Sequence, residues 1–177
     1  MSNVDAEVEC SPEQVQQLVQ CIIQEDLLLD LAKSIRLLPF ESRKDAQIIF
    51  SHILRWKPAN GRSSESAISY LVSKRPEIIT ELCRGYDYPE SALPSGTILR
   101  QAIMQDSLAA IILYDDSKQG EKAVRIMEVD VRRQESYQGL FWKFFDWIDK
   151  GSFEISADAF NTFRVSQGMP ILPPRPS

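Results

Sequence analysis

The sequence has few of the side chains from which catalytic and metal centres are built. It contains one histidine, His52, and three cysteines that form no C-x-x-C pair. A zinc site needs several cysteine or histidine ligands, and a lone histidine beside Phe50 and Ile53 on a predicted helix is more often structural than catalytic. The seven glycines form no phosphate-binding loop. We therefore predict a protein that is not an enzyme and that holds no cofactor and no metal.

The sequence also lacks targeting signals and a basic cluster. No apolar run reaches the length of a membrane span, and residues 1–10 lack the apolar core of a signal peptide. Cys10, Cys21 and Cys83 fit reduced thiols, although a bond between the first two stays open. The net charge of -5, with no run of lysine or arginine, argues against a protein that binds nucleic acid. We expect a cytoplasmic protein that binds neither nucleic acid nor a membrane.

What the sequence does contain is the apolar periodicity of amphipathic helices. Ser11 and Pro12 form a helix start with Gln14 in the capping-box position. Pro39 ends the second helix. Two prolines predict turns over residues 86–94. The predicted helices before the last loop cover residues 12–23, 27–38, 41–56, 66–72, 76–85, 95–105 and 108–114.

Residues 139–164 carry two apolar blocks on either side of a short polar break. The break, residues 149–152, contains a glycine and a serine that predict a helix end and a new N-cap. One apolar stripe is expected in the first block, made of Phe141, Phe144, Phe145 and Ile148. Core packing is the simpler interpretation of these aromatic residues. The alternative is a partly exposed anchor for a protein partner across residues 141–147.

The helical pattern repeats along the chain. Helix pairs occur at residues 27–54, 78–103 and 141–163, with no strand predicted between them. The predicted fold class is therefore all-α, a partial armadillo/HEAT-like helical-repeat solenoid, with a plain helical bundle as the alternative. The predicted domain organisation is a disordered N-terminus at 1–10, a helical-repeat domain at 11–164 with a long loop at 115–138, and a proline-rich disordered tail at 165–177.

Several charged or proline-containing segments have both a structural and a functional interpretation. Arg43, Lys44, Arg75 and Arg84 are most simply solvated, but they could line a groove and pair with an acidic partner. Residues 115–120 look faintly like a calcium loop, yet they lack the alternating acidic ligands and the closing glutamate. The P-x-x-P match at 170–173 is better explained as a disordered end.

Four long segments resemble fungal members of the mouse-protein-twenty-five-like family, also called calcium-binding-protein-thirty-nine-like. They are LLLDLAKSIRLLPFESRKDAQIIFSHILRW, RPEIITELCRGYDYPESALPSGTILRQAI, LAAIILYDD and FWKFFDWIDKGSFEISADAFNTFR. The similarity runs from about Ser11 to Arg164. It implies an armadillo-related scaffold without enzymatic activity. Relatives bind a protein kinase of the Ste20-like (germinal-centre) group or a related pseudokinase, and hold the kinase in its active conformation. In fungi the family is tied to polarised growth, cell separation and conidiation.

The resemblance also implies one contact residue. The segment GSFEISADAF matches a family motif whose phenylalanine lies on the concave, kinase-contacting face, and here that residue is Phe153. Family members continue beyond the position of Arg164 with further repeats, including the part that holds a partner's C-terminal Trp-Glu-Phe peptide. A last repeat without its neighbour would leave apolar surface exposed on the helix that carries Phe160 and Phe163.

Overall fold

The computed structural model describes residues 11–57, 66–115, 139–150 and 152–167. Within these ranges the chain forms α-helices and one 3-10 turn, and no strand, which confirms the predicted all-α class. The elements are α1 (Pro12–Gln24), α2 (Leu27–Ser34), α3 (Phe40–Arg55), α4 (Ala67–Ser73), α5 (Glu77–Arg84), η2 (Gly85–Asp87), α6 (Pro89–Ala102), α7 (Asp106–Tyr114), α8 (Leu140–Lys150) and α9 (Phe153–Gln167).

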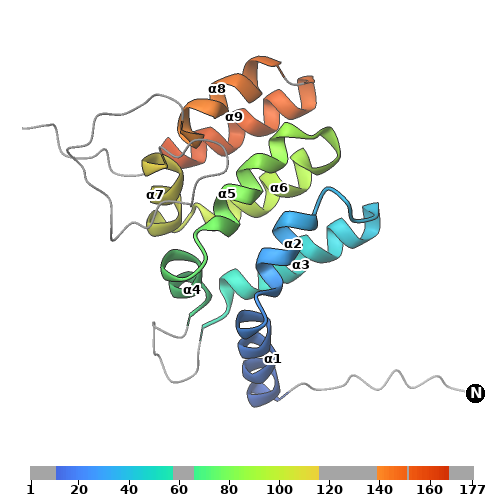
Figure 1. Cartoon of the computed structure of the whole chain (residues 1–177), viewed down its shortest axis with the longest axis vertical. Helices are drawn as coiled ribbons and strands as arrows, with labels where there is room; N and C mark the ends of the chain where they lie inside the picture. The colour runs from blue at the N-terminus through green and yellow to red at the C-terminus, as the bar shows by residue number, and fades with distance from the viewer. Residues whose placement is uncertain (1–10, 58–65, 116–138, 151, 168–177) are drawn as a thin grey trace, which may run out of the picture.

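The helices form three stacked pairs, each preceded by one further helix (Figure 1). The first pair is α2–α3, the second is α5–α6 and the third is α8–α9. Helix α6 packs against α3 on one side and against α9 on the other, while α2 packs against α5. The shorter helices α4 and α7 contact each other beside α5. These pairs coincide with the three repeats of the sequence, so the helical-repeat prediction is confirmed and the plain bundle is not supported.

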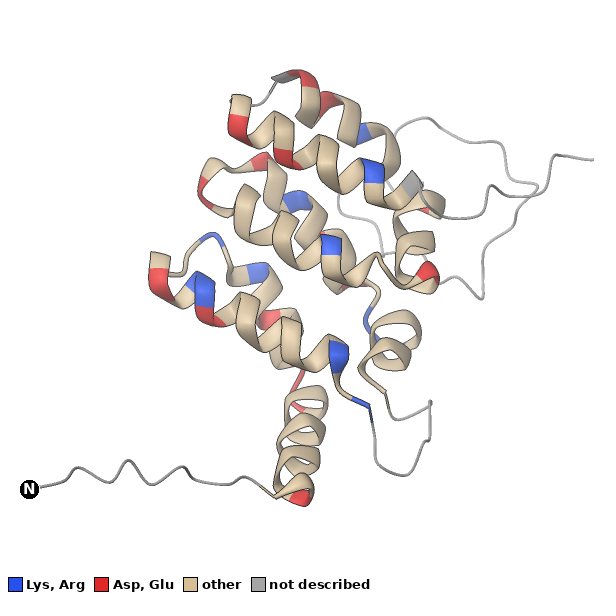
Figure 2. Ribbon diagram, turned by 180° about the vertical axis from the view of Figure 1, so that it is seen from behind, with Lys and Arg blue, Asp and Glu red and all other residues tan. Residues whose placement is uncertain are grey.

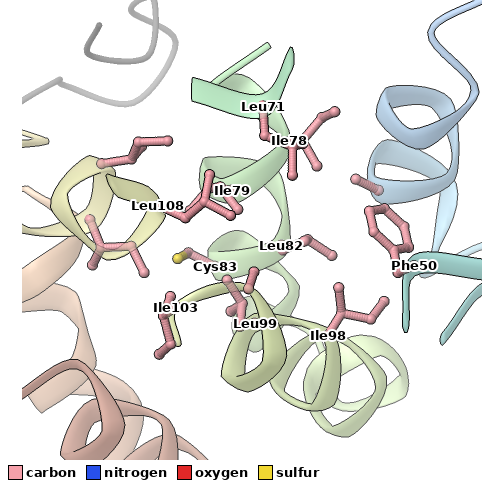
Figure 3. Packing of buried hydrophobic residues seen from close by; sticks show 14 of the residues in the cluster. Phe50, Leu71, Ile78, Ile79, Leu82, Cys83, Ile98, Leu99, Ile103 and Leu108 are labelled. Carbon is pink, nitrogen blue, oxygen red and sulfur yellow. The ribbon is translucent and has the colours of Figure 1, made fainter. Parts of the chain in front are cut away.

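A single apolar core runs through the stack. Figure 3 shows Phe50 of α3 pointing towards Ile98 of α6 and Leu82 of α5. On the other side of α5, Ile79 and Cys83 face Leu108 of α7 and Ile103. Fully burying one such aliphatic side chain stabilises a fold by about 1.5–3 kcal/mol. Because these contacts join successive pairs, no pair buries its apolar faces alone.

Of the predicted thiols, Cys83 belongs to this core and Cys21 is exposed. Burial raises the pKa of the Cys83 thiol, which keeps it protonated and unreactive. Cys10 lies outside the described residues.

Most helices begin where the sequence predicts, and one does not. The Ser11 hydroxyl accepts from the Gln14 N–H and the Gln14 side chain accepts from the Ser11 N–H, which is the expected capping box. The turn predicted over residues 86–94 is confirmed up to Tyr88, the C-cap of η2, but is wrong beyond it, because α6 already begins at Pro89 and contains Pro94 in its interior. Pro89 occupies the first helical position, where the missing N–H has no cost.

Pro94 leaves one helical carbonyl without its usual donor, and Arg43 fills that role. A proline cannot donate to the carbonyl four residues earlier, which here is that of Glu90. Arg43 Nη1 of α3 donates to Glu90 O at 2.8 Å, while its Nε and Nη2 donate to Ile35 O and Arg36 O at 3.2 and 3.1 Å. Arg43 therefore joins the end of α2 to the interrupted turn of α6, and is not simply solvated.

Arg75 also has a structural partner. Asp26 adopts a left-handed conformation with a φ of 53° between α1 and α2. Its carboxylate accepts from Arg75 Nε at 2.8 Å and from the Tyr70 hydroxyl at 2.7 Å. These hydrogen bonds, from Arg75 first and Tyr70 second, lower the pKa of Asp26 to about 2. The charged junction between α1 and α2 is thus fixed to the junction between α4 and α5.

Helix α9 extends past the predicted end of the repeat domain at Arg164. Val165 is half-buried, Ser166 is buried, and the Ser166 hydroxyl donates to Phe163 O at 2.6 Å. The first residues of the predicted tail at 165–177 therefore belong to α9, which runs to Gln167. The predicted N-terminus at 1–10, residues 116–138 of the predicted loop at 115–138, and residues 168–177 of the predicted tail lie outside the described residues.

Replacing Arg43 tests its link to the interrupted helix. We expect Arg43→Met to lower the free energy of unfolding by about 2 kcal/mol, because three carbonyls lose a charged donor. In a Pro94→Ala background, residue 94 regains an N–H for the Glu90 carbonyl. The cost of losing Arg43 should then fall by about 1 kcal/mol. Urea denaturation of the four proteins of this double-mutant cycle measures both values, and strictly additive effects would contradict the assignment.

Candidate partner-binding surface

The aromatic block of α8 packs differently from its predicted stripe. The residues of α8 buried against the stack are Leu140, Phe144 and Trp147. Phe145, which was predicted to face inward, is 47% exposed, and Trp142 is exposed too. The apolar residues of α8 cover more than one face, so periodicity alone could not identify the buried one. The core-packing interpretation is thus correct for Phe144 and Trp147, whereas Trp142 and Phe145 form an exposed apolar surface.

Tyr86 of η2 is the residue on which the third pair packs. Its buried ring stacks on Trp147, with centroids 5.4 Å apart, and meets the edge of Phe144 at 5.9 Å. Its hydroxyl donates to Asp158 Oδ2 of α9 at 2.6 Å and lies 2.8 Å from Thr162 Oγ1. Burial, together with the hydrogen bond to Asp158, raises the pKa of Tyr86, so the phenol stays neutral. One side chain therefore holds both helices of the third pair.

The polar groups around the Tyr86 hydroxyl satisfy one another. Arg100 Nη1 of α6 donates to Asp158 Oδ1 at 2.6 Å and to Thr162 Oγ1 at 3.0 Å. Since Tyr86 has one hydroxyl proton and gives it to Asp158, Thr162 donates to the Tyr86 oxygen and accepts from Arg100. The Arg100–Asp158 ion pair is partly buried, with 28% and 13% of the two side chains exposed, and its hydrogen bonds favour one geometry over its alternatives. This cluster of Tyr86, Arg100, Asp158 and Thr162 fixes the position of α9 against α6.

Gly96 makes room for this cluster. A Cβ atom on Gly96 would lie 1.9 Å from Asp158 Oδ2 and 2.3 Å from the Tyr86 hydroxyl oxygen. Any side chain at this position would therefore push α9 or Tyr86 away from α6.

Phe153, the predicted contact residue, is the first residue of the α9 helix so positioned. Its side chain is 89% exposed, the highest value among the exposed large apolar side chains of the described part. Ser152 precedes it as the predicted N-cap, with its hydroxyl 3.5 Å from the Ile155 nitrogen. Two turns further along α9, Phe160 is 51% exposed, whereas Phe163 packs against Phe141 with centroids 5.5 Å apart. The expected exposed apolar surface thus occurs at Phe160 but not at Phe163.

Comparison with known proteins assigns the fold to a family. A family model described as Mo25-like matches residues 1–166. The chain belongs to the Mo25-like family. It is 58% identical over 159 residues to the conidiophore development protein hymA of Emericella nidulans, an alignment that covers 89% of this chain and 41% of that protein.

More distant relatives match over the same region. The chain is 32% identical over 158 residues to a calcium-binding protein 39-like protein of Homo sapiens, covering 89% of the chain and 39% of the relative. It is 31% identical over 159 residues to a Mo25-like protein of Schizosaccharomyces pombe, covering 90% of the chain and 40% of the relative. The chain therefore spans about two fifths of the length of these curated relatives.

The remaining candidate residues of this Mo25-like chain do not gather into one site. Lys44 pairs with Glu41 at 3.2 Å, and Arg84 pairs with Glu81 at 2.6 Å, each within its own helix. His52 is exposed on α3. No group of three or more potential metal ligands occurs among the described side chains. In the part of the chain with described coordinates, no helix has the length and apolar character that crossing a membrane requires.

Asp115, the first residue of the segment compared with a calcium loop, has a structural contact. Its side chain is buried, and Oδ2 accepts from the Leu140 backbone N–H at 3.2 Å. It therefore caps the start of α8 from the end of α7. The other residues of that segment lie outside the described part.

Sequence reasoning missed the Tyr86 cluster altogether. Tyr86 lies in the region predicted as turns, while Arg100 and Asp158 belong to no recognisable motif. The one usable signal was Gly96, because a glycine inside a predicted helix often marks a close approach.

Gly96→Ala tests the packing of α6 against α9. A glycine-to-alanine change inside a helix normally stabilises it by about 1 kcal/mol. Here we expect a loss of about 2 kcal/mol in the free energy of unfolding, because the added methyl overlaps the Tyr86 cluster. The neighbouring Ser95→Ala is the matched control. Its hydroxyl is buried without a hydrogen-bond partner, so removing it should cost nothing. Urea denaturation measures the free energy of unfolding of both variants. A Gly96→Ala protein as stable as the wild type would contradict the close contact between Gly96 and the Tyr86 cluster.

Proposed function

We propose that this Mo25-like chain is a non-catalytic scaffold that binds a protein kinase of the Ste20-like, germinal-centre group, or a related pseudokinase. The partner would lie on the row of helices α3, α6 and α9 and would contact Phe153. We further propose a cytoplasmic role in polarised growth, cell separation and conidiation; the last of these agrees with the name of the Emericella nidulans relative, the conidiophore development protein hymA.

One observation supports Phe153 as a contact more than any other. A large apolar side chain that is 89% exposed at the start of a firmly packed helix gains little from packing against the described residues. Partner binding would remove it from water, and aromatic residues of this kind often dominate binding energy. The helix beneath it is held by the Tyr86 cluster, so binding would require little reordering of the scaffold.

Such a scaffold would act by population shift. It would bind the active arrangement of the kinase more tightly than the inactive one, and the difference in affinity would set the degree of activation. No group of the scaffold would take part in phosphate transfer.

The second candidate is a morphogenesis scaffold that brings proteins together without changing kinase turnover. Three further exposed aromatic residues favour a surface with more than one contact. They are Phe145, Trp142 and Phe160 of the third pair. Partner binding with an unchanged rate of phosphate transfer would favour this candidate.

Kinase activation by the wild-type chain and by Phe153→Ala tests the proposal. We expect the wild type to raise the rate of phosphate transfer by a Ste20-like kinase. Loss of the phenyl ring should raise the Kd for that kinase by about tenfold, as for a central aromatic contact. The control is Leu18→Ala, which removes an apolar side chain that is 61% exposed on α1, outside the row of α3, α6 and α9. Failure of the wild-type chain to bind or activate the kinase would overturn the proposal, and equal effects of the two substitutions would remove Phe153 from it.

A further inference from the structure

The turns within the three helix pairs lie on one edge of the stack (Figure 1). Each turn presents an exposed aromatic ring where the second helix of the pair begins. These rings belong to Phe40 at the start of α3, Tyr88 just before α6, and Phe153 at the start of α9. An exposed glutamate accompanies each ring in the first turn of the helix, namely Glu41, Glu90 and Glu154.

In the first pair, a lysine of the chain itself contacts both the ring and the glutamate. Lys44 Nζ lies 4.4 Å from the centre of the Phe40 ring and 3.2 Å from Glu41 Oε1. Lys44 follows Phe40 by four residues, which places it one helical turn further on the same face. The cation therefore meets an aromatic face and a carboxylate together, two contacts that favour a positive charge.

In the second pair, the cation comes from the preceding turn. The guanidinium carbon of Arg36, between α2 and α3, lies 4.1 Å from the centre of the Tyr88 ring. Two of the three aromatic residues on this edge are thus covered by a positive charge of the same chain.

The third pair has the ring and the carboxylate but no such cation. Ala157 stands four residues after Phe153, where α3 has Lys44 after Phe40. Among the lysines and arginines whose side chains the structure describes, none lies over Phe153 or pairs with Glu154. In Figure 2 the positions coloured as charged at the turn end of the third pair are acidic, whereas the first pair shows both signs there.

We infer that Phe153 and Glu154 form a binding site, the cation site, for an arginine or lysine side chain of the protein partner. The partner's cation would stack on the Phe153 ring and pair with the Glu154 carboxylate, as Lys44 does with Phe40 and Glu41. Arginine suits the site better than lysine, because its planar group stacks on a ring and donates to a carboxylate at once. This inference rests on the proposed function, since it names the chemistry that the partner brings to Phe153.

The test titrates the whole 177-residue chain, labelled on its phenylalanine rings, with N-acetyl-arginine amide. N-acetyl-citrulline amide, which has nearly the same shape but no charge, is the matched probe. We expect the Phe153 ring signals to respond to arginine in a saturable way, with an affinity at least about threefold higher than for citrulline. The response should weaken with added salt. Equal responses to the two probes would overturn the inference.

An internal lysine should block the site. Ala157→Lys restores the spacing found in α3, so its ammonium group should occupy Phe153 and Glu154 and abolish the arginine response. The control Asn161→Lys adds the same charge to an exposed position one turn further along α9. It should leave the response intact. Glu154→Gln provides a second, independent loss of affinity. If Ala157→Lys and Asn161→Lys bind arginine equally, the inference is wrong.

Kinase binding by the same variants separates this inference from the proposed function. An arginine response at Phe153 without any kinase binding would contradict the proposed function but would still support the cation site. Kinase binding that depends on Phe153 but is unaffected by Ala157→Lys and Glu154→Gln would support the proposed function and contradict the cation site.

Discussion

The contact of Tyr86 with the third helix pair is the interaction on which the candidate surface depends. The ring is buried against Trp147 and Phe144 of α8, and the hydroxyl reaches Asp158 and Thr162 of α9. Apolar burial supplies most of the stabilisation but has no preferred direction. The hydrogen bonds and the Arg100–Asp158 ion pair fix the direction of α9, because a shift of this helix would leave the buried hydroxyls of Tyr86 and Thr162 and the partly buried ion pair without their partners.

Similar polar contacts occur at each step along the stack. Arg75 connects to Asp26 between the first and second repeats, and Arg43 donates to the carbonyl that Pro94 leaves free. Each of them joins segments far apart in the sequence, and each compensates a local irregularity, either a left-handed residue or an interrupted helix. Repeats that contact only their neighbours need such contacts to set the angle between one pair and the next. The exposed edge with Phe40, Tyr88 and Phe153 follows from that regular stacking.

The sequence predicted the helices and their pairing, and family resemblance pointed to Phe153 as a contact, but the cluster that holds α9 was not predicted. Helical periodicity and caps are local properties, so Ser11, Ser66 and Ser152 could be recognised as helix starts. The choice of Phe144 over Phe145 as a buried residue depends on the shape of the neighbouring pair, which no local pattern contains. The start of α6 was missed because Pro94 argues against a helix unless the donor from Arg43 is known. Phe153 was found through family resemblance, since an exposed phenylalanine has no periodic signature.

The most direct test of this account is amide hydrogen exchange of the wild-type chain and of Tyr86→Phe. That substitution keeps the ring and removes the hydroxyl that reaches α9. The account predicts exchange roughly tenfold faster in α9, as expected for the loss of a buried hydrogen bond, with α2, α3 and α5 unchanged. Unchanged exchange in α9, or an equal increase throughout the chain, would contradict the claim that Tyr86 fixes the helix that presents Phe153.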